Sequence, residues 1–285
     1  MLDDGAAGFP ATLSPSRASD YMTCPLLFRF RSIDRLPEEP SVAQLRGNLV
    51  HTALEEVFDL PAQDRTPRSV LDLAEAALAR LREEDPAAAG IVTDDGPFAE
   101  AVTPLIRSYF ELEDPSRLEP HGREIGVLVD IEPGFALRGF IDRVDVAPDG
   151  AVRIVDYKTG KAPKPAYEGK ALFQMRFYAL AWWRQHGVVP RMLQLLYLGS
   201  KQALRHAPDE AELVATERKI LALRDAIASS ADAGEFAPTP GKLCDWCSHR
   251  ALCPSWGGSP PALPPRAQWP SAGRRPEPAD GASGE

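Results

Sequence analysis

The chain of 285 residues has an apolar fraction of 44% and a formal net charge of -9. These values allow a sizeable hydrophobic core and speak against a protein that binds nucleic acids through a generally basic surface. A local basic channel remains compatible with this charge. Two stretches could form such a channel, although each could equally be solvated surface charge: Arg29, Arg31 and Arg35, and Lys158, Lys161, Lys164 and Lys170.

The first residues, MLDDGAAGFP, are acidic and lack the basic region and apolar run of a signal peptide. No window approaches the ~20 apolar residues that a membrane-spanning helix needs. We therefore expect a cytoplasmic protein. In that compartment cysteines more often bind metal or take part in chemistry than form disulfides.

The spacing of apolar residues predicts helices first, then strands, then a helix, a strand and a helix. The first helices are expected within 14–30, 41–58, 67–84 and 98–112. The strands that follow, joined by turns at EPGF and APDGA, are expected over 123–131, 135–147 and 151–158. The last helix, strand and helix are expected over 171–186, 192–200 and 209–228.

This order predicts one α/β domain over residues 1–256, with helices flanking a central mixed sheet. Residues 257–285 are rich in Pro, Gly, Ala and Ser, and we expect them to form a disordered tail.

The turn between the last two strands decides which side chains share a face. A two-residue turn at Asp149-Gly150 would place Asp142 and Asp156 on opposite faces. A three-residue loop, 148–150, instead pairs Val144 with Ile154 and Asp142 with Asp156, and on the other face Asp145 with Arg153. The second register separates apolar from polar side chains better, and we prefer it.

In that register the two aspartates are direct neighbours on a largely apolar face that also includes Phe140. Two unpaired carboxylates there would repel each other and be costly to desolvate, so a positive group is expected between them. Lys158, on the same face, could form a structural salt bridge. The alternative is a divalent cation, because hard oxygen ligands suit magnesium or manganese.

Further polar residues stand on predicted helices. His51, in GNLVHTALEE, is one residue that could complete a metal site, although a lone histidine is more often exposed or structural. Gln174 and Tyr178 are separated by four residues and share a helix face. On their own they could be the polar edge of a packing helix.

Four segments in order, GNLVH, LRGFIDRVD, IVDYKTGK and QMRFYALA, resemble the RecB-like branch of the PD-(D/E)XK nuclease family. The resemblance covers nearly the whole chain up to about residue 256 and implies a restriction-endonuclease-like core. The first acidic residue follows isoleucine here and not the proline of the superfamily's name, as is usual in this branch.

The resemblance implies a role for each matching residue. The metal ligands would be His51, Asp142 and Asp156, with the backbone carbonyl of Tyr157, and the ion would be Mg²⁺ or Mn²⁺. Lys158 would orient or activate the attacking water and stabilise charge on the phosphate. Gln174 and Tyr178 would support the site and the path of the DNA. Glu124 would lie at the outside of this site, beyond the metal ligands.

The four cysteines are Cys24 and a group near the other end of the chain, Cys244, Cys247 and Cys253. A zinc site is one alternative, with His249 as a further ligand, although zinc ribbons usually use two Cys-x2-Cys pairs. One early cysteine with a later C-x2-C-x5-C-P resembles the iron–sulfur region of AddB-type and CRISPR-associated RecB-like exonucleases. That resemblance implies a [4Fe–4S] cluster that clasps the two ends of the chain.

Together these features predict a metal-dependent DNA nuclease, and most simply an exonuclease that acts on single strands or ends of DNA in repair or recombination. The alternative is a non-cutting DNA-binding module that partners a helicase. The sequence holds no G-x-x-x-x-G-K-[ST] motif, so any unwinding would need another chain.

Overall fold

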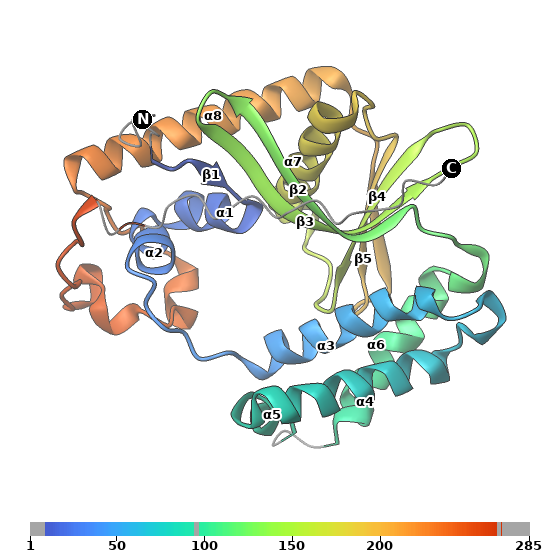
Figure 1. Cartoon of the computed structure of the whole chain (residues 1–285). Coiled ribbons are helices and arrows are strands. Elements are labelled where there is room, and N and C mark those ends of the chain that lie inside the picture. The colour runs from blue at the N-terminus through green and yellow to red at the C-terminus, as the bar shows by residue number, and fades with distance from the viewer. Residues whose placement is uncertain (1–8, 94–96, 267–268, 270–285) are drawn as a thin grey trace, which may run out of the picture. The chain divides into compact units, whose positions relative to one another are not determined.

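The computed structural model of the chain describes residues 9–93, 97–266 and 269, and its elements are labelled in Figure 1. The helices are α1 (Pro15–Thr23), α2 (Pro25–Phe28), α3 (Val42–Glu56), α4 (Pro67–Glu84), α5 (Pro86–Thr93), α6 (Phe98–Leu112), α7 (Glu168–His186) and α8 (Glu210–Ala233). The strands are β1 (Thr12–Leu13), β2 (Gly122–Glu132), β3 (Phe135–Val146), β4 (Val152–Lys158), β5 (Met192–Tyr197) and β6 (Gln202–His206).

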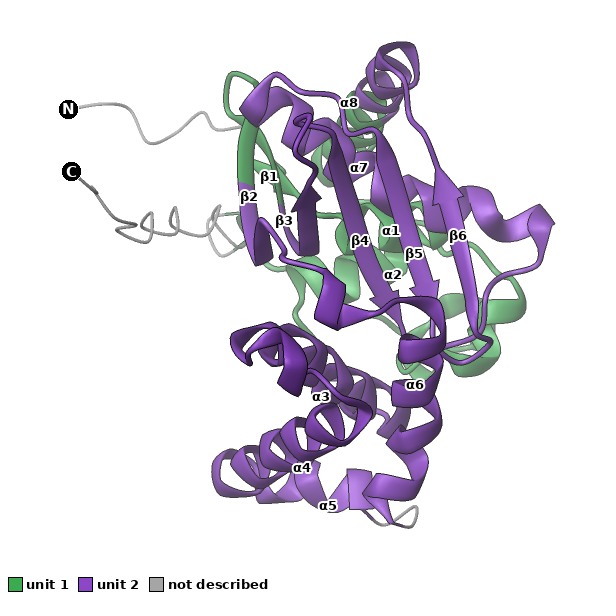
Figure 2. Ribbon diagram, turned by 90° about the vertical axis from the view of Figure 1, so that its right-hand side faces the viewer, with its two compact units in different colours: residues 1–37, 128–138, 220–285 green, residues 38–127, 139–219 purple. Residues whose placement is uncertain are grey.

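The chain divides into two compact units, which Figure 2 shows in different colours. Unit 1 comprises residues 1–37, 128–138 and 220–285, and unit 2 comprises residues 38–127 and 139–219. Within the described part of the chain, no helix is long and apolar enough to cross a bilayer. Most of the predicted tail, 257–285, lies outside the described residues.

Local sequence explains where several helices begin. Ser14, Ser41 and Thr66 each accept a hydrogen bond from a backbone N–H in the first turn of α1, α3 and α4. These hydroxyls satisfy donors that have no partner inside the helix. Pro15 and Pro67 occupy the first helical position, where a missing N–H costs nothing.

Unit 2 contains a mixed sheet. The second part of β3 pairs antiparallel with β4, β4 pairs parallel with β5, and β5 pairs antiparallel with β6. A mixed sheet flanked by helices was predicted and is confirmed, and it is consistent with a restriction-endonuclease-like core. α5 and β6 were not predicted, and α7 begins earlier than expected.

The two faces of β4 have different neighbours. Val155 and Tyr157 belong to a buried apolar cluster with residues of α3, α4, α5 and α6. The alternate residues face α7, where Gln174 contacts Asp156. Because side chains alternate along a strand, one face of β4 packs on the helical core and the other faces α7, where buried Val152 and Ile154 precede Asp156.

Unit 1 brings together the early helices and the later part of the chain. The Tyr21 hydroxyl donates to the carbonyl of Ala226 at 2.8 Å, which joins α1 to α8. The rings of Phe28 and Phe236 stack with centroids 6.4 Å apart. β1 pairs in parallel with Ala136 and Leu137 at the start of β3.

Candidate functional site

The β3–β4 hairpin has the predicted three-residue loop. The Gly150 N–H donates to the Ala147 carbonyl at 2.8 Å, and Gly150 has a φ of 82°. Glycine adopts this left-handed conformation without the steric cost that a Cβ brings. The pairs Val144–Ile154 and Asp145–Arg153 form as predicted, so the register is confirmed.

The ladder between β3 and β4 ends at Arg143 and Val155, one residue before the two aspartates. There the Tyr157 N–H donates to Asp142 Oδ2 at 2.8 Å. Asp142 therefore uses its side chain to hold β4. The placement of Phe140 on the buried face is wrong, because 52% of this residue is exposed.

Asp156 is the most buried of the predicted site residues, with 2% of its surface exposed. Lys158 Nζ lies 3.0 Å from Asp156 Oδ1 and 2.7 Å from Oδ2. Gln174 Nε2 donates to Oδ1 at 2.8 Å, and Gln174 Oε1 accepts from Lys158 at 3.2 Å. The predicted carboxylate, lysine and glutamine thus form one connected group.

His51 comes to the same place from α3. Its Nδ1 lies 3.4 Å from Asp142 Oδ2. Burial is the largest cause that lowers the pKa of His51, and Lys158 adds to it, while Asp156 opposes it. A lowered pKa favours the neutral imidazole, which is the form that binds metal ions.

The two carboxylates act on each other. Burial is the largest cause that raises the pKa of Asp142, and the Asp156 carboxylate raises it further. The hydrogen bond from the Tyr157 N–H and the charge of Lys158 oppose this shift. For Asp142, burial and the neighbouring like charge therefore outweigh the hydrogen bond and the lysine.

A cavity of about 590 Å³ adjoins this group, lined by α3, Glu124 of β2 and the end of β4 with the turn after it. His51 and Lys158 line it, whereas Asp142 and Asp156 do not. Burial, followed by Glu55 and Asp156, raises the pKa of Glu124. Glu124 has a φ of 45°, which is uncommon for a residue with a side chain.

Sequence reasoning missed the α3 residues that line this cavity beside His51: Gln44, Asn48, Thr52 and Glu55. Gln44, Asn48, His51 and Glu55 are spaced by four, three and four residues, which places them on one helix face. That spacing of polar residues along one face of the helix was the available signal.

Tyr178 lies one helical turn after Gln174 and is largely buried. Burial raises the pKa of Tyr178, the Asp156 charge raises it further, and a hydrogen bond with Gln174 opposes the shift. The predicted pair on α7 thus lies beside Asp156.

A second missed group lies on the other face of the same strands. Arg143 is fully buried, and its guanidinium donates to both carboxylate oxygens of Glu113 at 3.0 and 2.8 Å. It also donates to the Tyr157 hydroxyl at 2.6 Å and lies 3.1 Å from Asp145. Tyr157 is therefore held at its side chain by Arg143, while its N–H binds Asp142.

The turn after Lys158 is packed closely against its neighbours. A Cβ on Gly199 would lie 2.7 Å from the carbonyl oxygens of Thr159 and Gly160. A Cβ on Gly47 of α3 would lie 3.2 Å from Thr159 Oγ1. Two glycines thus allow the backbone that carries Lys158 to approach β5 and α3.

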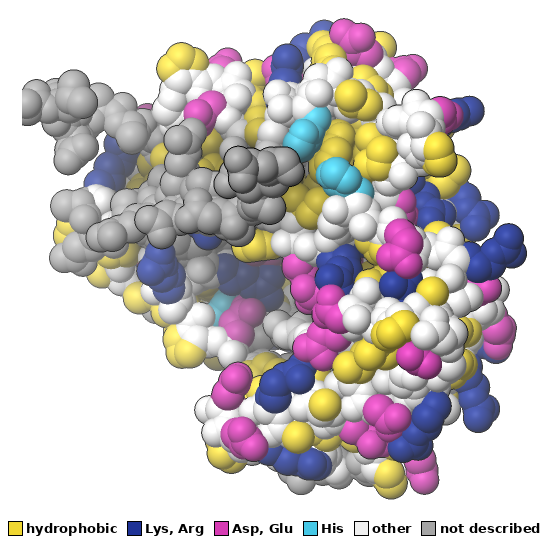
Figure 3. All heavy atoms as spheres, turned by 45° about the vertical axis from the view of Figure 1, so that its right-hand side comes forward, with side chains coloured by type: hydrophobic (Ala, Val, Ile, Leu, Met, Phe, Trp, Pro, Cys, Tyr) yellow, Lys and Arg dark blue, Asp and Glu magenta, His cyan; other side chains and the backbone are white. Residues whose placement is uncertain are grey.

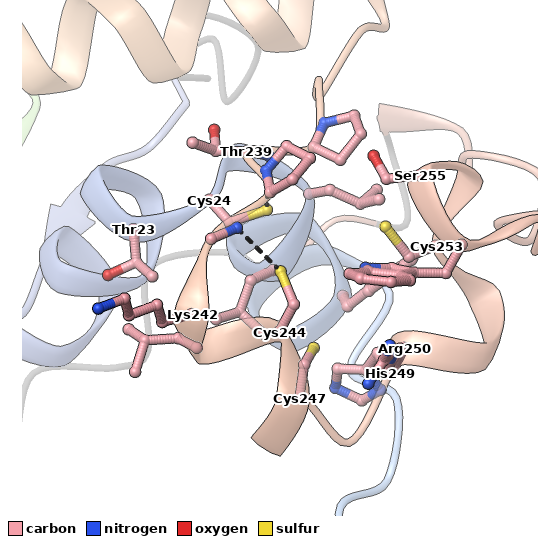
Figure 4. Close-up of a pocket in the computed structure, with 18 residues that line it drawn as sticks. Thr23, Cys24, Thr239, Lys242, Cys244, Cys247, His249, Arg250, Cys253 and Ser255 are labelled. Atoms are coloured by element: carbon pink, nitrogen blue, oxygen red, sulfur yellow. Dashed lines mark hydrogen bonds between the residues drawn. The ribbon is translucent and has the colours of Figure 1, made fainter.

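All four cysteines lie in unit 1 and line one cavity of about 250 Å³, which Figure 4 shows with their sulfur atoms around it. The Thr239 N–H donates to Cys24 Sγ at 3.4 Å, and the Gly241 N–H donates to Cys244 Sγ at 3.3 Å. Burial is the largest cause that raises the pKa of Cys247, and Cys24 and Cys244 raise it further. A backbone hydrogen bond at His249 opposes this shift. His249 also lines this cavity.

Among residues 9–93, 97–266 and 269, no three His, Cys, Asp or Glu side chains are already gathered in a geometry that could hold a metal ion. The positive group next to the Asp156 carboxylate in this structure is the Lys158 ammonium.

Comparison with known proteins now places the chain in a family. Residues 12–254 match the PD-(D/E)XK nuclease superfamily, and the chain belongs to it. The match supports a nuclease, and members of this superfamily generally use divalent metals such as Mg²⁺.

Two similar proteins extend the comparison. The Gene 69 protein of Mycobacterium phage D29 is 26% identical over 268 residues, which cover 85% of this chain and 96% of that protein. The crystal structure of a "Putative exonuclease" from Eubacterium rectale has a TM-score of 0.54 and 14% identity, and covers 84% of this chain and 88% of its own. The latter likeness supports the fold.

Proposed function

We propose that this chain is a metal-dependent DNA exonuclease that hydrolyses phosphodiester bonds in DNA repair or recombination. The observation that carries the proposal is the group formed by Asp142, Asp156, Lys158 and Gln174 beside His51. The name of the Eubacterium rectale protein supports the exonuclease assignment. In this proposal residues 1–256 form one nuclease domain that includes both compact units.

The side chains at this site fit a divalent cation. Asp142 and Asp156 offer carboxylate oxygens, which are the ligands that Mg²⁺ and Mn²⁺ prefer, and His51 offers a neutral imidazole. The raised pKa of Asp142 indicates a place where further positive charge would be stabilising. In the proposal His51, Asp142, Asp156 and the Tyr157 carbonyl hold the ion. A divalent ion there polarises the phosphate and lowers the pKa of a bound water.

The other residues have roles that follow from their charge. The Lys158 ammonium is positioned by Asp156 and Gln174, and it can donate to a phosphate oxygen or orient the attacking water. Negative charge grows on the non-bridging oxygens during hydrolysis, so a fixed cation nearby lowers the barrier. Gln174 links Asp156 to Lys158 and so preserves their spacing, with Tyr178 packed behind it.

We expect the purified protein to degrade DNA in the presence of Mg²⁺ or Mn²⁺ and not in excess chelator. The substrates are single- and double-stranded oligonucleotides labelled at either the 5′ or the 3′ end. An exonuclease releases single labelled nucleotides from one end and a ladder from the other. Lys158→Ala should abolish cleavage, since it removes the cation beside Asp156.

Two results would count against this function. Equal rates of cleavage by the wild type and Lys158→Ala would show that Lys158 takes no part in the reaction. Binding of DNA without cleavage in either metal would favour the non-cutting module, and a helicase would then be the partner to seek.

We also propose that Cys24, Cys244, Cys247 and Cys253 hold a [4Fe–4S] cluster as a structural clasp. In support of this, four thiols line one cavity, and two of them already accept backbone N–H hydrogen bonds. Such hydrogen bonds to sulfur are typical of iron–sulfur sites. Zinc, with His249 available, is the alternative that the donor set also permits.

Protein purified without oxygen is expected to be brown and to contain iron and acid-labile sulfide. Cys247→Ser should lose both and unfold at a lower temperature, because one of the four thiolates is missing. Ser255→Ala changes a residue that lines the same cavity and should retain the iron. A colourless protein with stoichiometric zinc and no iron would contradict the cluster.

A further inference from the structure

The segment between β4 and α7 leaves the site directly after Lys158 and carries an unusual set of side chains. Lys161, Lys164 and Lys170 are exposed, and 66% of Tyr167 is exposed. We call residues 161–170 the lysine–tyrosine loop. Three cations and an aromatic ring within ten residues stand out in a chain whose net charge is -9.

The charge of this loop is local. On the face that Figure 3 shows, acidic and basic side chains are interspersed and do not form one basic surface. Among the ion pairs of the described residues, Lys158 is paired with Asp156 and Lys201 with Glu111, while Lys161 and Lys164 are in none. These two ammonium groups are therefore available to an anion from solution.

The backbone attaches the loop at its start and forms a turn in its middle. The Gly199 N–H donates to the Gly160 carbonyl at 3.1 Å, and the Ala162 N–H donates to Ser200 Oγ at 3.0 Å. Pro165–Tyr167 form a short 3-10 turn, closed by the Tyr167 N–H on the Lys164 carbonyl at 2.8 Å. Pro163 and Pro165 restrict the backbone further. A surface held in this way loses less conformational entropy when it binds a ligand.

We propose that the lysine–tyrosine loop binds single-stranded DNA, with Lys161 and Lys164 on backbone phosphates and Tyr167 stacked on a base. Lysines that follow a phosphate backbone and an aromatic ring that stacks on bases are the usual parts of a single-strand site. The inference rests on the proposed nuclease function, and it assigns the residues that would bind a single strand beside the site.

The ring of Tyr167 is the reason for preferring a single strand. In a duplex the bases stack on one another, and their faces are not free to meet a side chain. In a single strand the face of each base is accessible to an aromatic side chain. Lys161 lies three positions after Lys158, a span of at most roughly 11 Å of backbone. A strand held at Lys161 therefore passes close to Lys158.

The test measures binding of the full chain in chelator, where no cleavage occurs. The probes are a fluorescent single-stranded DNA, its duplex, and an RNA of the same sequence, followed by anisotropy. Tyr167→Ala should weaken single-strand binding about ten-fold, while Tyr167→Phe, which keeps the ring, should bind as the wild type does. Duplex binding should be weaker and should not respond to Tyr167→Ala.

The lysines are tested by the dependence of binding on salt. Each phosphate contact contributes roughly 0.7 to the slope of log K against log salt for a single strand. Lys161→Gln with Lys164→Gln should therefore reduce the slope by about 1.4. Lys201→Gln is the matched control, because Lys201 is exposed, lies outside the loop and is already paired with Glu111, and its slope should not change.

The outcomes separate this inference from the proposed function. Unchanged single-strand binding by Tyr167→Ala, an equal loss for duplex, or tighter binding of the RNA would overturn the loop assignment, even if DNA is cleaved. Tyr167-dependent binding without cleavage in Mg²⁺ or Mn²⁺ would overturn the nuclease function and leave the loop assignment standing.

Discussion

Replacing Asp156 with asparagine is expected to reduce metal-dependent DNA cleavage by about 10³-fold or more. The change removes a buried negative charge that is proposed to hold a divalent ion, and loss of an ion worth several kcal/mol to the transition state corresponds to that factor. Gln174 can still donate to the remaining oxygen, so the fold should be retained. The measurement is the initial rate of release of labelled nucleotides.

Asp149→Asn is the matched control for that variant. Asp149 lies in the loop of the same hairpin, is exposed, and accepts a hydrogen bond from the Ala151 N–H through Oδ1, which an asparagine oxygen can also accept. Its cleavage rate should equal that of the wild type. Full activity of Asp156→Asn, with both variants folded by circular dichroism, would refute the assignment of Asp156.

Replacing Arg143 with methionine is expected to lower the free energy of unfolding by about 3–5 kcal/mol, the usual cost of removing one partner from a buried ion pair. Arg143 compensates the buried Glu113 carboxylate and holds the Tyr157 hydroxyl. Without it, Glu113 keeps only the more distant Arg153, 3.3 Å away, and the amide of Gln194. Urea unfolding followed by circular dichroism gives the value.

Arg191→Met provides the comparison for the stability experiment. Arg191 is exposed and lies 3.5 Å from Asp149, also exposed. Pairs of this kind contribute little, so the unfolding midpoint should stay where it is. If Arg143→Met and Arg191→Met unfold at the same urea concentration, the buried network is not a source of stability.

The helix α4 was predictable from its end signal, the Thr66 cap, whereas α6 has no capping side chain and was predictable from the spacing of its apolar residues. The ranges 67–84 and 98–112 coincide with α4 and α6. α5 was missed because PAAAGIVT has small residues and no clear polar face. β6 was missed because QALRH has no β-branched or aromatic residue, and its conformation depends on pairing with β5.

Local chemistry also predicted that Asp156 and Lys158 share a face, whereas His51 and Gln174 were assigned to the site through the resemblance to known nucleases. The loop at 148–150 sets the register, and strand alternation then places Asp156 and Lys158 on one face. The Arg143 network could not be predicted in the same way. Its main partner, Glu113, lies 30 positions earlier in the chain, just after α6, and only the tertiary fold brings the two together.

The lysine–tyrosine loop also has a practical consequence for protein engineering. It is attached to β5 and the turn after it at Gly160 and Ala162, and its side chains from Lys164 to Tyr167 are exposed. Residues at these positions can therefore be varied without changing any side chain of the hydrophobic core or of the group around Asp156. With the proposed binding role of the loop, a library confined to this stretch is expected to change substrate preference separately from the chemical step.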